Sequence, residues 1–65
     1  MDGQNGRLLS PLEVAKYLGL SRSFVYQLAE TGDLPCVKIG RSIRFRPRAI
    51  EQFIEDREQA QEART

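Results

Sequence analysis

The sequence predicts a small, mainly α-helical domain with one β-hairpin, in the order helix, helix, hairpin, helix. Two short amphipathic segments follow each other between Ser10 and Glu30, a period-2 pattern runs from Cys36 to Arg46, and a further apolar repeat begins after Pro47. A chain of 65 residues, 40% of them hydrophobic and 29% charged, has the composition of one soluble globular domain. A domain of this size buries only about 60% of its unfolded surface, so we expect modest stability.

The first helix is predicted from Pro11 to Gly19. Ser10 can cap its free amides, Pro11 occupies the first helical position, and Glu13 completes a capping box. Gly19 ends the helix, because a left-handed residue is favoured at that point.

The second helix is predicted from Arg22 to about Glu30, with Ser21 as its cap and Gly32 after its end. The helical period gives it an apolar face and a polar face. The apolar face comprises Val25, Leu28 and Ala29, with Phe24 at its flank. The polar face comprises Ser23, Tyr26, Gln27 and Glu30, with Arg22 near the helix start.

The two predicted helices have the spacing of a helix-turn-helix. Gly19 follows Ala15 by four residues, and Val25 follows Gly19 by six. Two short helices joined by a turn that contains glycine form this motif, whose second helix fits the major groove of DNA. The spacing therefore predicts DNA binding through the second helix.

A hairpin is predicted from Cys36 to Arg46, around a tip at Gly40-Arg41. We expect one face of it to be apolar and packed on the helices, because an isolated hairpin is marginal in water, and the other face to be basic and exposed. The expected apolar face comprises Val37, Ile39, Ile43 and Phe45. The expected basic face comprises Lys38, Ser42, Arg44 and Arg46.

Pro47 breaks the second strand and can start a third helix, in which Ile50, Phe53 and Ile54 fall at positions i, i+3 and i+4. The fold class is therefore a winged helix-turn-helix. We expect residues 1–7 to be a disordered lead-in, residues 8–57 to form the winged helix-turn-helix DNA-binding domain, and residues 58–65 to be an acidic tail or a fraying helix end.

The composition argues against several other functions. The chain has no histidine, and Cys36 is its single cysteine, so we expect no disulfide, no metal site, no cofactor and no enzymatic activity. Cys36 is more simply a small buried residue than a redox switch. No apolar run approaches the roughly 20 residues needed to span a bilayer, and the polar start is no signal peptide, so we expect a cytoplasmic protein.

The net charge is only +1, but the charges are unevenly distributed. From Leu34 to Ile50 there are five basic residues and no acidic one, whereas residues 51–65 carry five acids against two arginines. A local basic stripe in a nearly neutral chain suits the backbone of a DNA duplex. The five basic residues are Lys38, Arg41, Arg44, Arg46 and Arg48.

We expect the second helix to read bases and the hairpin to hold the backbone and enter the minor groove. Gln27 can pair with adenine, and Arg22 can take a phosphate or a guanine. The Ser21 and Ser23 hydroxyls, with the amides of the helix N-terminus, are natural phosphate ligands. Arg41 at the tip suits a narrow A·T-rich minor groove. The predicted DNA-binding residues are Ser21, Arg22, Ser23, Tyr26, Gln27, Lys38, Arg41, Ser42, Arg44 and Arg46.

Simpler explanations remain beside these. The polar helix face is also what any solvated helix shows, and charges on an exposed strand also prevent edge-to-edge aggregation. The alternative to base contact for Tyr26 is that its ring lies along the surface as part of the flank of the core. Glu30 is interpreted as a rim residue; an acid there would repel phosphate, or could accept a hydrogen bond from a cytosine amino group. The three phenylalanines are interpreted as core residues rather than as base-stacking groups.

Residues 8–21 (LLSPLEVAKYLGLS), 32–35 (GDLP) and 38–45 (KIGRSIRF) resemble the excisionase family of small DNA-binding proteins, which are minimal MerR-like winged helices. The resemblance covers about residues 8 to 57. It implies that Ser23, Tyr26 and Gln27 lie in the major groove and Arg41 in the minor groove. Phe24 departs from the pattern, because many relatives carry a small residue there. The C-terminal segment lacks an apolar heptad, so no stable coiled-coil dimer is expected.

Excisionases of phages and mobile elements bind repeated sites near an attachment site, bend the DNA and steer a recombinase toward excision. The resemblance therefore implies double-stranded DNA and an integrase or recombinase as partners, cooperative head-to-tail self-association on DNA, and the cytoplasm of a bacterial host cell. The alternative is a small MerR-like transcription regulator. A protein-interaction module acting through the acidic third helix is a further alternative.

Overall fold

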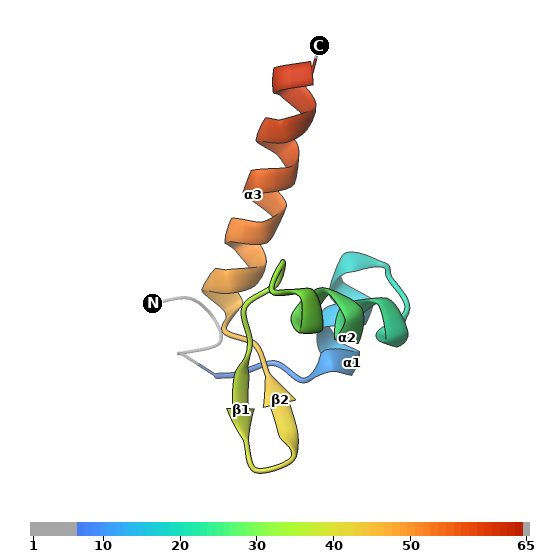
Figure 1. Cartoon of the computed structure of the whole chain (residues 1–65), viewed down its shortest axis with the longest axis vertical. Helices are drawn as coiled ribbons and strands as arrows, with labels where there is room; N and C mark the ends of the chain where they lie inside the picture. Colours follow the sequence, from blue (N-terminus) through green and yellow to red (C-terminus); the bar gives the residue numbers. More distant parts are fainter. Residues whose placement is uncertain (1–6, 65) are drawn as a thin grey trace.

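The computed structural model describes residues 7–64, with side chains described for residues 7–59. The elements are α1 (Pro11–Leu18), α2 (Arg22–Thr31), β1 (Val37–Ile39), β2 (Ser42–Arg44) and α3 (Pro47–Arg64). This order confirms the predicted fold class. The hairpin and α3 project in opposite directions, and α1 and α2 lie beside their junction (Figure 1). Apart from Arg7, the predicted lead-in lies outside the described residues.

The first helix begins and ends as its sequence predicts. The Glu13 backbone N–H donates to Ser10 Oγ over 3.1 Å, and the Ser10 backbone N–H donates to Glu13 Oε1 over 2.9 Å. Arg7 adds an ion pair of 2.7 Å with the same carboxylate. The Ser10 N–H and, secondly, the Arg7 guanidinium hold the pKa of Glu13 below its usual value. Gly19 ends α1 with a φ of 71°.

The second helix is capped by Ser21, whose Oγ accepts a hydrogen bond of 3.1 Å from the Phe24 N–H. It ends at Gly32, which has a φ of 86°. The short turn between Leu18 and Arg22 brings α2 back against α1, so that the apolar faces of the two helices meet. These two helices form the helix-turn-helix that the spacing predicts.

A small apolar core joins the three helices to the hairpin through Ile43 and Phe45. The turn after α2 contributes Leu34, which is fully buried and whose N–H donates to the Leu28 carbonyl over 3.1 Å. The buried hydrophobic residues are Val14, Ala15, Val25, Leu28, Leu34, Phe45 and Ile50.

Among the described residues, one backbone pairing ties the hairpin to the segment that enters α1. The Leu9 N–H donates to the Phe45 carbonyl, and the Phe45 N–H donates to the Leu9 carbonyl, each over 2.8 Å. The Phe45 side chain is fully buried between them and the core. The segment that enters α1 therefore runs antiparallel to the end of β2.

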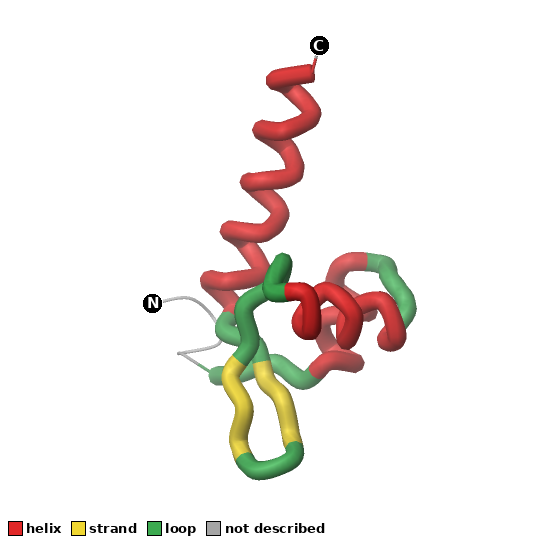
Figure 2. The backbone as a smooth tube through the Cα atoms, viewed as in Figure 1, coloured by secondary structure: helices red, strands yellow, loops and turns green. Residues whose placement is uncertain are grey.

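The two strands of the hairpin pair antiparallel, with Val37 opposite Arg44, Lys38 opposite Ile43, and Ile39 opposite Ser42 (Figure 2). Residues directly opposite each other lie on the same face of a sheet. One face therefore carries Lys38 with Ile43, and the other carries Val37 and Ile39 with Ser42 and Arg44. The predicted division into one apolar and one basic face is wrong.

The reason is the length of the turn. With the two residues Gly40 and Arg41 at the tip, odd-numbered positions of β1 pair with even-numbered positions of β2. The apolar residues of the two strands consequently point to opposite faces. Ile43 packs against the core, whereas Ile39 is 56% exposed.

The three phenylalanines also differ from one another. Phe45 is buried and Phe53 is half-buried, as expected of core residues. Phe24 is 42% exposed and lies outside the core, so its assignment as a core residue is wrong. Phe24 lies in the first turn of α2, at the edge of the apolar stripe. Cys36 is half-buried at the start of β1.

Among the described side chains, the first turns of α3 supply its contacts with the core. Ile50 is 1% exposed, Phe53 and Ile54 pack partly against the core, and the Arg57 guanidinium lies 4.7 Å from the centre of the Phe53 ring. Residues 58–64 continue the same helix. Among the described residues, none of the helices has the length and apolar character that a membrane span requires.

The capping box predicts a pH dependence of stability. Because the pKa of Glu13 is lowered on folding, its contribution is present above the usual carboxyl pKa of 4.5 and is lost as the pH falls through and below that value. As the pH is lowered from about 5 to about 3, the free energy of unfolding measured in urea should therefore fall more steeply for the wild type than for Glu13→Gln. The exposed α3 variant Glu55→Gln should keep the wild-type profile; equal slopes for the wild type and Glu13→Gln would contradict the coupling.

The register predicts different costs for two similar substitutions in the hairpin. Ile43→Thr should lower the free energy of unfolding by about 1–2 kcal/mol, because partly buried methyl groups are lost and a hydroxyl is brought near the core. Ile39→Thr keeps a β-branched side chain at an exposed position and should change it by less than about 0.5 kcal/mol. Denaturant titration of both variants tests this, and the opposite ranking would show that Ile39 faces the core.

Candidate nucleic-acid interface

The outward face of α2 is polar and fully accessible. Val25 and Leu28 are buried in the core, so the residues on the opposite side of α2 point toward solvent. Tyr26 is 48% exposed, which places its ring on the surface rather than in the core flank. The exposed residues of this face are Ser23, Tyr26, Gln27 and Glu30.

The N-terminus of α2 adds further donors to this face. Ser21, Arg22 and Ser23 are all exposed there. Ser21 Oγ accepts the Phe24 N–H, and its hydroxyl hydrogen can still donate outward. Free amides at the first turn and a positive helix end favour an anionic ligand.

The tip of the hairpin carries Gly40, Arg41 and Ser42, all exposed. Gly40 has a φ of 62°, a left-handed conformation that favours glycine and allows the tight turn. The tip lies at the opposite end of the molecule from the C-terminus of α3 (Figure 1). It is therefore a narrow projection with one guanidinium at its end.

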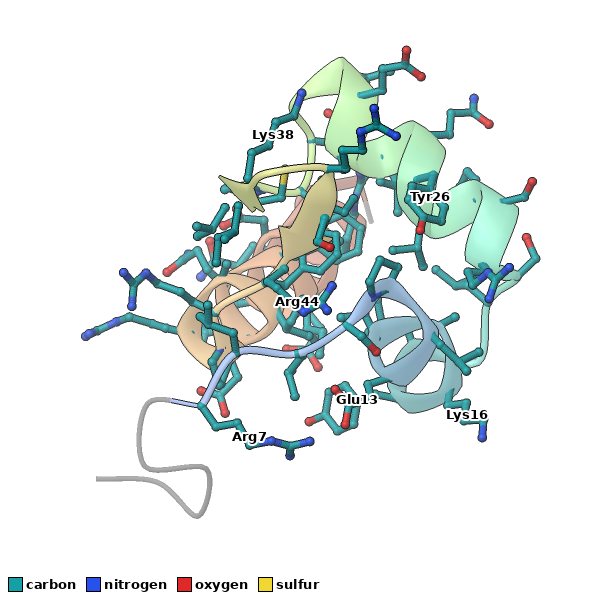
Figure 3. The ribbon with its side chains drawn as sticks, turned by 90° about the horizontal axis from the view of Figure 1, so that it is seen from below. Arg7, Glu13, Lys16, Tyr26, Lys38 and Arg44 are labelled. Carbon is teal, nitrogen blue, oxygen red and sulfur yellow. The ribbon has the colours of Figure 1, made fainter. Side chains whose placement is uncertain are left out.

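The other basic residues of the hairpin do not share a surface. Lys38 and Arg44 lie on opposite sides of the strands (Figure 3). Lys38 is exposed on the side that faces α2. Arg44 is half-buried on the other side, and its Nη1 donates to the Ile43 carbonyl over 2.7 Å.

Arg46 lies at the base of the hairpin, away from the tip. Together with Arg48 it lines an open hollow of about 510 Å³ between the turn after α2 and the start of α3. Asp33 and Asp56 line the same hollow. Two acids beside these arginines make this hollow less attractive to a phosphate than the surface around Lys38 and Arg41.

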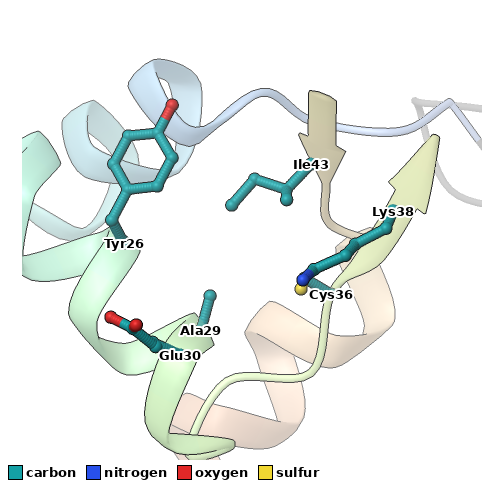
Figure 4. Close-up of a pocket in the computed structure, with 6 residues that line it drawn as sticks. All are labelled: Tyr26, Ala29, Glu30, Cys36, Lys38 and Ile43. Carbon is teal, nitrogen blue, oxygen red and sulfur yellow. The ribbon is translucent and has the colours of Figure 1, made fainter. Parts of the chain in front are cut away.

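A second open hollow, of about 370 Å³, separates α2 from the hairpin (Figure 4). Its half-buried floor is formed by Ala29, Cys36 and Ile43. Its rim is formed by the exposed residues Tyr26 and Glu30 of α2 and Lys38 of β1, whose side chain points into the hollow. This hollow was not among the predicted features, although the two-residue turn indicates that Lys38 and Ile43 share a face.

The structure thus brings together part of the predicted set. Tyr26 of α2 and Lys38 of β1 line one hollow, and the exposed tip follows Lys38 two residues later in the chain. Arg44 and Arg46 lie on other surfaces. Among the side chains that the structure describes, the acids and Cys36 form no group of three that could hold a metal ion.

Comparison with known proteins agrees with this architecture. Residues 8–58 match the family model described as a helix-turn-helix domain. Two curated proteins of Mycobacterium tuberculosis are each 37% identical over 57 residues, which is 85% of this chain and 73% of theirs. They are "Putative DNA-binding protein MT0521" of strain CDC 1551 and "Putative DNA-binding protein Rv0500A" of strain H37Rv. No solved structure matches the chain significantly.

Proposed function

The chain belongs to the helix-turn-helix domain family that residues 8–58 match, and on this premise we propose that it binds double-stranded DNA in a sequence-specific manner. The observation that carries the proposal is the position of the polar face of α2 beside a hairpin that ends in Arg41. The names of the two mycobacterial relatives, which refer to DNA binding, support it. The function that we propose is binding without catalysis.

In this proposal α2 enters the major groove. Ser23, Tyr26 and Gln27 reach the base edges, because they are exposed on the face of α2 that is turned away from α1. Ser21 and Arg22 contact phosphates at the N-terminus of the helix. Arg41 and Ser42 lie at the tip of the hairpin, which is the wing of this fold, and they enter the adjacent minor groove. A guanidinium is attracted there most strongly over narrow A·T-rich steps.

Lys38 contributes a phosphate contact from the side of the hairpin that faces α2. Arg44 and Arg46 contribute phosphate contacts only through reorientation or from the edges of the site, because they lie on other surfaces. We therefore expect Lys38 and Arg41 to contribute more to DNA affinity than Arg44 and Arg46 do. Neutralising one true phosphate contact lowers the slope of log affinity against log salt by about 0.9.

The biological role that we propose is that of an excisionase, which promotes excisive recombination by shaping DNA and recruiting a recombinase. Its support is the resemblance carried by residues 8–21, 32–35 and 38–45. The charge layout supports head-to-tail association on DNA, since the basic tip and the acidic α3 point in opposite directions (Figure 1). Neighbours on adjacent sites would then bring opposite charges together. A small MerR-like transcription regulator is the alternative role.

Selection of genomic fragments by the purified protein, followed by sequencing, tests both levels of the proposal. Enrichment of short direct repeats beside a recombination attachment site is the result expected for an excisionase. Enrichment at promoters away from such sites would replace that role by transcription regulation. If no fragment is enriched over bulk DNA at near-physiological salt, sequence-specific binding itself is wrong.

Replacement of Gln27 is expected to change the base preference of the protein rather than to weaken its binding to all DNA. Gln27→Ala should cost about 1–3 kcal/mol at one position of the selected site and little on unrelated duplexes, because a base contact carries sequence information and a phosphate contact does not. Gln52→Ala on α3 is the matched control and should bind as the wild type does. Fluorescence anisotropy on a panel of single-base variants provides the measurement; a uniform loss on every duplex would remove Gln27 from base readout.

A further inference from the structure

The hollow between α2 and the hairpin has an uneven lining that the proposed function does not explain. Its floor is apolar, with Ala29, Cys36 and Ile43 half-buried. Its rim is polar and carries opposite charges, Glu30 on α2 and Lys38 on β1 (Figure 4). Both residues line the hollow, and the ion pairs found among the described residues do not include this pair.

Two elements in neighbouring grooves must straddle one strand of the duplex. The major and minor grooves of DNA are separated by a single sugar-phosphate strand, and α2 and the wing tip are proposed to enter one groove each. The hollow lies between these two elements. A strand that runs through it would set its deoxyribose rings against the apolar floor and its phosphates against the rim.

We propose that this hollow seats the sugar-phosphate strand that separates the two grooves, and that Glu30 limits its affinity. This inference rests on the proposed DNA binding. Lys38 attracts the phosphates, whereas the Glu30 carboxylate repels them from the opposite rim. Glu30 thereby lowers binding to any DNA backbone and leaves more of the selectivity to the base-reading face of α2.

This role differs from base readout by Glu30 in a measurable way. A carboxylate that accepts from cytosine loses affinity at one base position when it is replaced, whereas a carboxylate that repels phosphate gains affinity on every sequence when it is replaced. Glu30→Gln should therefore bind an A·T-rich and a G·C-rich duplex about threefold to tenfold more tightly than the wild type at low salt. The gain should shrink as salt is raised, because screening weakens the repulsion.

Glu55→Gln is the matched control, since it removes the same charge from an exposed site on α3. On a duplex that holds a single site, where no neighbouring copy contacts α3, it should leave affinity within about twofold of the wild type. Lys38→Gln should weaken binding to both duplexes and lower the salt slope by about 0.9. Fluorescence anisotropy across several salt concentrations measures all four proteins.

Cys36 supplies an independent probe of what occupies the hollow. It is the single cysteine of the chain and lies half-buried in the floor. A seated strand should slow alkylation of Cys36 by N-ethylmaleimide several-fold at saturating duplex, as followed by mass spectrometry. In the double variant Cys36→Ser/Gln52→Cys the thiol lies on α3, and its alkylation should be unaffected by DNA.

Uniformly tighter binding by Glu30→Gln together with protection of Cys36 supports the proposal. If the wild type binds DNA but Cys36 reacts equally fast with and without it, the strand does not lie in the hollow. If Glu30→Gln loses affinity at a single base position, Glu30 reads a base instead. In both cases the proposed function stands and this inference falls. If the wild type binds no duplex, both are wrong.

Discussion

The pairing of Leu9 with Phe45 is the constraint on which the rest of the structure depends. Leu9 directly precedes the cap of α1, and Phe45 directly precedes Arg46, whose carbonyl accepts the first backbone hydrogen bonds of α3. Two backbone hydrogen bonds of 2.8 Å and one fully buried ring therefore join the start of α1, the end of β2 and the start of α3. The direction in which the wing projects follows from this junction, because a hairpin with two short strands has little stability of its own.

Local signals in the sequence predict the elements well. The Ser10 and Ser21 caps and the left-handed glycines after α1 and α2 act within one helical turn, so adjacent residues are enough to locate them. The faces of the hairpin are a different case. Alternation within each strand is visible in the sequence, but the turn length relates the alternation of one strand to that of the other, and the two-residue tip places Ile39 outside and Ile43 inside.

The parts of the candidate site that the sequence does not predict are those made by tertiary packing. Leu34 resembles an ordinary turn residue in the sequence, yet it is fully buried, because the turn after α2 packs against the core. The hollow that joins Glu30 to Lys38 needs both the return of the chain after α2 and the register of the hairpin. Neither residue has a distinctive neighbour in the sequence, and their chemistry becomes apparent only when they face one space.

The separation of charge explains how a chain of net charge +1 can present a surface that attracts an anion. The acids Glu55, Asp56 and Glu58 lie roughly 12 to 16 Å along α3 from its start, and α3 points away from the wing (Figure 1). At physiological salt the Debye length is about 8 Å, so these acids cancel little of the field at Arg41 or Lys38. Glu30 is different, because among the acids whose side chains the structure describes it is the one that shares a hollow with Lys38. In the proposed binding mode, the balance between Glu30 and Lys38 therefore matters more for binding than the net charge does.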